Sequence, residues 1–250
     1  MTTRERVVIL VKAWPQPSLK YGETVCCAGV TLNGQWRRLF PIRFRHLEGP
    51  QKFKRWDIIE YLPHTPNDDN RAESRRVEEQ SLKRLKSVPK HERASFLEGV
   101  IRRSIGEAAE RNDSLALIRP DKIEFIAKRK SSEKIESEKA ARSKRLLQRS
   151  LLDRELIDLE ICEFRLSMRF AAGGTNHHME LGDWETAAAF FRFRKEKGEA
   201  FALRHLKDTY ENTYFNRGLA LALGTVKKRP RQWLLLGVIR LDLPTSTFLI

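Results

Sequence analysis

The sequence predicts an α+β protein: a β-rich, barrel-like N-terminal unit, a charged helical middle, and C-terminal strands that complete a sheet. Three observations lead to this fold class. β-branched runs alternate with turn residues over the first 66 residues. Apolar residues recur at helical spacing in the charged stretch that follows, and two apolar runs of strand length close the chain.

Composition limits what the chain can be. The 250 residues include 48 Lys plus Arg and 33 Asp plus Glu, which gives a formal net charge of +15 with histidine neutral. A chain of this length with 40% hydrophobic residues can bury a core, so disorder throughout is excluded. No stretch reaches the ~18–20 apolar residues of a membrane span, and the first residues do not resemble a secretion signal. We expect no membrane contact.

The three cysteines indicate a reducing environment. Cys26 and Cys27 are adjacent, and Cys162 stands alone, so the sequence contains no CxxC pair. A disulfide framework or a cysteine-based zinc site is therefore not expected. This pattern predicts a cytoplasmic protein.

The N-terminal unit, residues 1–66, begins with a strand. Val7–Ala13 is rich in β-branched residues and is followed by prolines that cannot donate to a sheet. Tyr21–Leu32 fits a helix or a strand, because Gly22 and Gly29 weaken both. We favour a helix that starts at Gly22 and a strand near Ala28–Leu32.

A hairpin follows in the same unit. Asn33 and Gly34 form the pair preferred in a type I′ turn, which needs positive φ at both central residues. Trp36–Arg43 and Trp56–Leu62 are the next expected strands. A basic loop separates them.

The middle of the chain, residues 67–159, is predicted to be charged and mainly helical. Turn-forming residues in Pro63–Asn70 indicate a boundary or an exposed loop. His91–Ser104 places its apolar residues at helical spacing, whereas Ser114–Lys128 returns to strand character. Ser131–Leu159 predicts a basic helix of several turns.

The C-terminal part, residues 160–250, is predicted to be α+β and to pack with the N-terminal unit as one domain. Glu160–Ala171 alternates apolar and polar residues, the pattern of a strand with one buried face. Asp183 is a candidate N-cap for a helix over Trp184–Lys197. A second helix is expected over Glu199–Tyr214.

The first candidate site is a basic segment interleaved with aromatic residues. Cations neutralise phosphates, and exposed aromatic faces stack on unpaired bases at about 1–3 kcal/mol each. A half-buried strand gives the same pattern, with aromatics in the core and cations outside. The candidate nucleic-acid-binding residues are Arg37, Arg38, Arg43, Arg45, Lys52, Lys54, Arg55, Trp36 and Trp56.

The second candidate site is the turn between the last two strands, Gly218–Val226 and Gln232–Leu243. Four of the five residues of this turn are cations: Lys227, Lys228, Arg229 and Arg231. A short hairpin tip directs such charges together toward solvent or a phosphate backbone. The alternative is a turn whose charges keep apolar strands from aggregating, and both roles can hold together.

One cluster has residue types suited to catalysis. His178, Asp183 and Glu185 could bind Mg²⁺, Mn²⁺ or Zn²⁺ and activate a water, as in a metal-dependent nuclease. An acidic helix N-terminus accounts for Asp183 and Glu185 without a metal. No second cluster completes a metal shell, so we expect no metal and no cofactor, and we assign no enzyme activity.

Several motifs together resemble an uncharacterised family of prokaryotic and phage proteins. They are YGETVC, WRRLFPIRFR, the AES of Ala72–Ser74, HHMELGDWE and GTVKKRPRQWLLLGVI. The resemblance spans most of the chain and implies no established activity. The basic β-unit is also similar to PUA and ASCH-type barrels, which bind RNA or modified DNA; this is an analogy of fold alone.

These observations favour a nucleic-acid-binding protein that contacts phosphates of DNA or RNA through a basic, aromatic-interleaved β-surface. The first alternative is the metal-dependent nuclease described above. The second is a basic subunit of a defence or mobile-element complex, in which the helix over residues 131–159 docks on an acidic protein partner.

Overall fold

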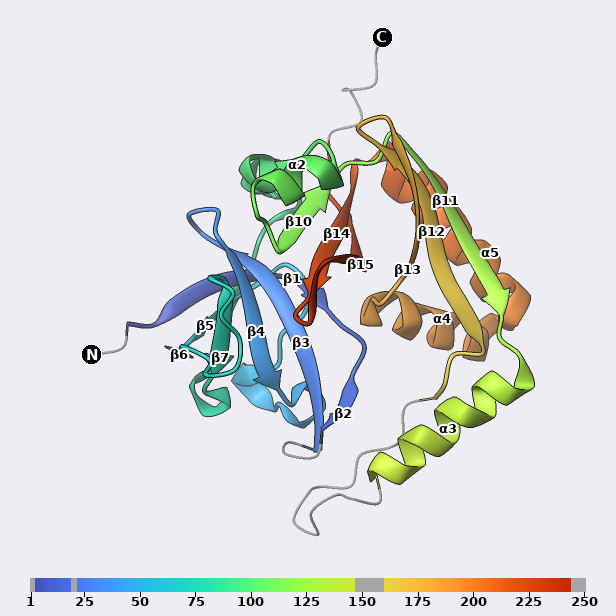
Figure 1. Ribbon diagram of the computed structural model, residues 1–250, viewed down its shortest axis with the longest axis horizontal. Coiled ribbons are helices and arrows are strands. Elements are labelled where there is room, and N and C mark those ends of the chain that lie inside the picture. Colours follow the sequence, from blue (N-terminus) through green and yellow to red (C-terminus); the bar gives the residue numbers. More distant parts are fainter. Residues whose placement is uncertain (1–2, 19–21, 147–159, 244–250) are drawn as a thin grey trace.

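The computed structural model describes residues 3–18, 22–146 and 160–243. Three sheets lie side by side in it: a curled N-terminal sheet, a middle sheet, and a three-stranded sheet covered by helices (Figure 1). The protein is thus α+β with a β-rich N-terminus, as predicted. Among the described residues, every helix is too short or too polar to cross a bilayer.

The N-terminal sheet has eight strands in the order β6-β7-β4-β3-β1-β5-β8, with β2 paired to β3. Its strands are β1 (Glu5–Lys12), β2 (Gln16–Ser18), β3 (Gly22–Thr31), β4 (Trp36–Ile42), β5 (Asp57–Tyr61), β6 (Pro63–His64), β7 (Ser74–Val77) and β8 (Lys83–Ser87). The expected helix start at Gly22 is wrong, because Gly22–Thr31 forms one strand, β3, which pairs with β1 and β4. Gly29 makes this pairing possible: a Cβ there would lie 2.1 Å from the Val8 carbonyl oxygen.

The β3–β4 hairpin forms where it was predicted, with a different turn. Gly34 has a φ of 81°, whereas Asn33 is not among the residues with positive φ. The Gly34 amide donates to the Thr31 carbonyl at 3.0 Å, and the Thr31 amide donates to the Gln35 carbonyl at 2.8 Å. This loop, one residue longer than a type I′ turn, requires only one residue in the left-handed region.

The middle sheet has four strands, in the order β15-β14-β10-β9. They are β9 (Ile101–Arg102), β10 (Leu115–Ile118), β14 (Leu219–Val226) and β15 (Arg229–Arg240). β14 and β15 form the antiparallel pair that was predicted, and β14 pairs on its other side with β10.

Both faces of the middle sheet are buried. Leu117 and Ala220 pack with Val8 and Leu10 of the N-terminal sheet. On the opposite face Leu221 lies in the core that is shared with the three-stranded sheet and the helices. Burial on both faces explains why the strand sequences are almost continuously apolar instead of alternating.

The third sheet contains β11 (Lys122–Arg129), β12 (Phe164–Ala172) and β13 (Thr175–Glu180). Helices α4 (Trp184–Lys197) and α5 (Glu199–Asp208) contribute to the same core, and α5 continues as the π-helix η6 (Thr209–Tyr214). Asp183 caps α4 by accepting the Glu185 amide, and Gly198 ends it with a φ of 84°. The prediction of this helix from its two end signals is confirmed.

In the middle of the chain, helices are shorter than expected and strands lie between them. The helices are α1 (Arg93–Leu97), α2 (Ile105–Glu110) and α3 (Ser132–Leu146), with 3-10 turns η1 (Phe44–His46), η2 (Gly49–Gln51), η3 (Glu79–Ser81), η4 (Lys90–Glu92) and η5 (Glu98–Val100) elsewhere. The helix expected over His91–Ser104 ends early because Ile101–Arg102 pairs with β10. Tertiary pairing thus overrides helical periodicity here. The second half of the predicted helix Ser131–Leu159 lies outside the described residues.

Candidate functional site

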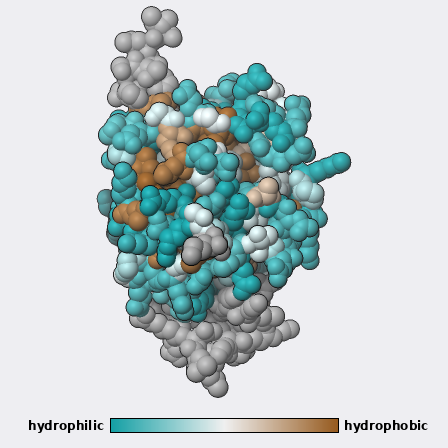
Figure 2. Space-filling model, turned by 90° about the vertical axis from the view of Figure 1, so that its left-hand side faces the viewer, coloured by the Kyte–Doolittle hydropathy of each residue, from teal (hydrophilic) through white to brown (hydrophobic). Residues whose placement is uncertain are grey.

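The arginines of the first basic segment contact carboxylates. The N···O distances are 2.7 Å for Arg37–Glu5, 3.9 Å for Arg38–Glu73, 2.8 Å for Arg43–Glu79, 3.3 Å for Arg45–Glu23 and 3.0 Å for Arg55–Asp183. A phosphate would have to displace these partners, so the five arginines do not form the free cationic track that we predicted. The left-hand side of the molecule in Figure 1, where the N-terminal sheet lies, has a largely hydrophilic surface with apolar residues across its upper part (Figure 2).

The lysines of the same segment differ from the arginines. Lys52 and Lys54 are exposed, and neither has a carboxylate partner within the described ranges. Strand β8, which packs against η2, adds the exposed Lys83 and Lys86. We had not predicted these two lysines as binding residues. The sequence feature that could have indicated them is the charged run KRLKS, which is typical of an edge strand protected by lysine.

The two tryptophans proposed for base stacking pack inside the fold. Trp56 is only 5% exposed and belongs to the core between the N-terminal and middle sheets. The Arg93 guanidinium lies 4.7 Å from the centroid of its ring. Trp36 is half-buried against the same core. Trp56 is therefore unavailable to a base in this conformation, which matches the half-buried-strand alternative.

The metal trio is not assembled. His178 lies on β13, where its Nε2 is 3.0 Å from the Ser167 hydroxyl. Asp183 and Glu185 instead contact cations, Arg55 and Lys12 respectively. In the part of the chain that the structure describes, no three His, Cys, Asp or Glu side chains are grouped to hold a metal ion. The geometry of these residues gives no support to the nuclease hypothesis, because Asp183 and Glu185 form ion pairs with Arg55 and Lys12.

These carboxylates belong to a buried polar network between the two halves of the chain. Arg55 donates to Asp183 and, at 2.8 Å, to the Val238 carbonyl. The Thr186 hydroxyl donates to Asp183 at 2.9 Å and lies 2.6 Å from the Tyr210 hydroxyl. Every partner of Asp183 is thus a hydrogen-bond donor, which is what a carboxylate with 1% of its surface exposed requires.

The second carboxylate of the network is held ionised. Glu185 forms an ion pair with Lys12, in which Nζ of Lys12 lies 2.7 Å from Oε1 of Glu185. Burial opposes ionisation of Glu185, yet Lys12 and Arg55 together hold its pKa below the ordinary value. Lys12 also lies 4.5 Å from the Phe44 ring centroid. The network joins β1, the loop before β5 and the first turn of α4.

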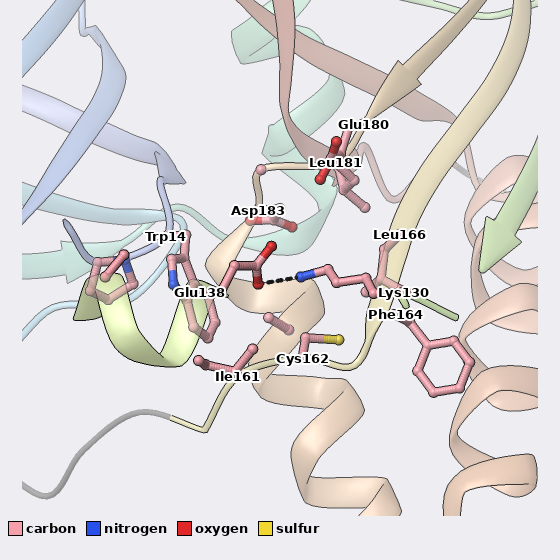
Figure 3. A pocket seen from close by; sticks show the side chains of 14 residues that line it. Trp14, Lys130, Glu138, Ile161, Cys162, Phe164, Leu166, Glu180, Leu181 and Asp183 are labelled. Carbon is pink, nitrogen blue, oxygen red and sulfur yellow. Dashed lines mark hydrogen bonds and ion pairs between the residues drawn. The ribbon is translucent and has the colours of Figure 1, made fainter. Parts of the chain in front are cut away.

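A cavity of about 430 Å³ adjoins this network (Figure 3). Lys130 and Glu138 form a 2.8 Å ion pair at its wall, and Trp14 and Asp183 also line it. Burial raises the pKa of the Cys162 thiol, which keeps the sulfur protonated and a poor nucleophile. The polar groups here are already paired, so the cavity offers no catalytic arrangement.

The β14–β15 hairpin carries a group of exposed cations. Lys228, Arg229 and Arg231 are exposed at its tip, and none has a carboxylate partner among the described residues. Lys227 pairs with Asp68 at 3.3 Å. The Arg71 guanidinium donates to the Thr225 carbonyl at 3.1 Å, two residues before Lys227.

The loop that anchors the hairpin is itself tightly bonded. Arg71 donates to Asp69 at 2.7 Å, and the Ser74 hydroxyl donates to the same carboxylate at 2.8 Å. Burial opposes ionisation of Asp69, but these hydrogen bonds lower its pKa to about 2. The end of β14 next to the tip is therefore held by a hydrogen-bonded loop, and the tip cations beyond it are exposed.

Comparison with known proteins identifies the family. Residues 3–103 match the family described as Domain of unknown function (DUF8758), and residues 100–248 match Domain of unknown function (DUF8757). The chain therefore belongs to the DUF8757 family, which confirms the predicted membership of an uncharacterised family. No curated protein matches the chain.

Several solved structures match the chain, and one of them aligns with much of it. It is titled "Crystal structure of the tetrameric p202 HIN2", is 13% identical, and aligns with 75% of this chain and 76% of its own. The TM-score is 0.27. At this value the likeness supports no argument about fold or function.

Proposed function

We propose that the protein binds nucleic acid and that the tip of the β14–β15 hairpin makes its principal phosphate contacts. The single observation behind this proposal is the group Lys228, Arg229 and Arg231, exposed on an anchored hairpin and without carboxylate partners in the described residues. The exposed lysines on β8 and before β5 form the second candidate contact: Lys52, Lys54, Lys83 and Lys86. The arginines from Arg37 to Arg55 serve the fold.

The physical argument is electrostatic. A cation that contacts a phosphate releases condensed counterions, and this release dominates affinity for DNA and RNA. Side chains already bonded to carboxylates gain little, because the existing ion pair must be broken first. The three tip cations have no ion pair to lose within the described residues, and only the neutral Gln232 accepts a hydrogen bond from Arg229. Chain segments that are held by their neighbours also lose less conformational freedom on binding. The hairpin tip meets both conditions.

The experiment compares binding to labelled duplex DNA, single-stranded DNA and RNA across a series of salt concentrations, using fluorescence anisotropy. The triple variant Lys228→Gln, Arg229→Gln, Arg231→Gln should bind more weakly. Loss of three phosphate contacts should reduce the slope of log K against log salt by about 2–3. We expect weaker binding and a smaller salt slope with both DNA and RNA.

A matched control removes the same charge elsewhere. Arg119, Lys122 and Lys128 are exposed residues on or beside β11 and have no carboxylate partners in the described chain. Replacing these three by Gln should leave the salt slope nearly unchanged. Equal losses in the two triple variants would show that only net charge matters and would overturn the assignment to the hairpin.

A further inference from the structure

A second cavity, of about 510 Å³, lies between the N-terminal sheet and the C-terminal helices. Its volume is within the ~300–1,000 Å³ typical of small-molecule sites. Its walls come from the loop before β5, from α1, α4 and α5, from the π-helix η6 and from the end of β15. The residues used below are Trp56, Arg93, Arg192, Phe193, Tyr214 and Arg240.

The cavity has an excess of positive charge. The cations are Arg55, Arg93, Arg192 and Arg240 in the wall and Lys12 behind Glu185; the carboxylates that face them are Asp183, Glu185 and Asp242. Five cations against three carboxylates leave two positive charges uncompensated. Arg192 is exposed and has no carboxylate partner in the described residues. The Nε atoms of Arg55 and Arg93 are buried without a hydrogen-bond acceptor.

Flat side chains alternate with these cations. Arg93 lies over Trp56, with its Nη1 fixed by Asp242 at 2.6 Å. Arg192 lies 4.5 Å from the Phe193 ring centroid. Guanidinium planes and aromatic rings both offer stacking surfaces to a nucleobase. The wall thus combines stacking surfaces with donors for an anion.

Unusual backbone conformations gather at the same cavity. Trp56, in the wall, has a φ of 72°, and Asp242, which pairs with the wall residues Arg93 and Arg240, has a φ of 57°. The wall also includes Thr209, Tyr210 and Tyr214 of the π-helix. Residues with positive φ other than glycine, and π-helical turns, are energetically costly and are enriched at functional sites. Their concentration around one cavity distinguishes it from an ordinary packing gap.

From these observations we infer that the cavity binds one phosphorylated nucleoside, with its base on the Phe193 and Arg93 side and its phosphate at Arg192. The ligand is either a free nucleotide or the phosphorylated end of a strand, since both present the same chemistry. This inference goes beyond the hairpin contacts, because the cavity and the hairpin tip share no residue.

The test is isothermal titration calorimetry of the full chain with adenosine 5′-monophosphate, adenosine and inorganic phosphate. The nucleotide should bind about tenfold or more tightly than either component, because only the nucleotide engages both the flat wall and the cations. Arg192→Gln should weaken nucleotide binding by about tenfold. Phe193→Leu should weaken adenosine 5′-monophosphate more than the uridine nucleotide, since the larger base stacks over more area.

The matched control is Arg204→Gln. Arg204 is exposed on α5, has no carboxylate partner in the described residues, and is not part of the cavity wall. This variant should bind the nucleotide like the parent protein. Absence of nucleotide binding at millimolar concentration, or equal losses in Arg192→Gln and Arg204→Gln, would overturn the inference.

Short oligonucleotides identify the source of the ligand. If a 5′-phosphorylated oligonucleotide displaces the mononucleotide and its unphosphorylated counterpart does not, the cavity holds strand ends; if neither displaces it, the ligand is the free nucleotide. The triple hairpin variant should keep its affinity for the mononucleotide. Failure of the hairpin proposal would therefore leave nucleotide binding in the cavity unaffected. Failure of the cavity inference would likewise leave the salt-dependent binding at the hairpin unaffected.

Discussion

The segment from Arg37 to Arg55 and the hairpin tip are both strongly basic in sequence and differ in what their charges contact. Five arginines of the first segment lie within 4 Å of carboxylates. Three of the four cations at the hairpin tip have no such partner in the described residues. The sequence of a segment thus gives its number of cations. The fold determines how many of them are free of carboxylate partners and can contact a phosphate.

The reason lies in where each region sits. Strand β4 and the loops after it are surrounded by other elements, which bring acids from distant positions: Glu79 is 36 residues from Arg43, and Asp183 is 128 residues from Arg55. The hairpin tip is exposed, and within the described residues Asp68 is the one carboxylate that pairs with a tip cation. Acids that the fold brings close from distant positions therefore convert a candidate binding cation into a structural one, even where the cation is exposed, as Arg43 is.

The largest expected effect comes from breaking a structural pair. Asp183→Ala leaves the Arg55 guanidinium buried without its counter-charge and also removes the N-cap of α4. The free energy of unfolding should fall by about 3–5 kcal/mol, measured by urea denaturation. Glu124→Gln, which breaks an exposed pair with Arg169, should change it little. Equal small changes in both variants would contradict a structural role for the buried pair.

Helix α4 shows what local sequence signals can predict. The sequence next to this helix predicts Asp183 as its N-cap and Gly198 as the residue that ends it, and the structure has both at these positions. The apolar runs of β14 and β15 likewise predict strands. A continuous apolar run of this length indicates a strand that is buried on both faces, and this can be recognised without knowing which elements cover it. Asp183 was also a candidate metal ligand, and of its two interpretations the helix N-terminus is correct.

The rest could not be predicted because it depends on residues distant in the chain. Strand β3 replaces an expected helix start because β1 and β4 lie on either side of it. The partner of Arg55 lies in the other half of the molecule, and no local pattern indicates it. The walls of the 510 Å³ cavity come from five separated segments, so its composition emerges only from the fold.

An intermediate effect should separate stability from binding within the first segment. Arg37 is 12% exposed and donates to Glu5, to the Trp36 carbonyl and to Gln35. Arg37→Gln should lower the free energy of unfolding by about 1–2 kcal/mol, because these charge-assisted hydrogen bonds are lost. Nucleic-acid affinity and its salt slope should stay unchanged. A reduced slope with unchanged stability would mean that Arg37 contacts phosphate after all.

The smallest effect concerns the loop that anchors the hairpin. The pKa of Asp69 is about 2 in the folded protein, below its ordinary value of 3.8, so the folded state binds the proton less readily than the unfolded chain. Its contribution to stability is therefore complete above about pH 4 and is lost as the pH falls toward 2. Asp69→Asn should cost no more than about 1 kcal/mol at pH 7, because solvent screens part of the interaction. In unfolding measurements the difference between parent and variant should shrink from pH 5 to pH 2; a difference that stays constant would mean that Asp69 has the same pKa in both states.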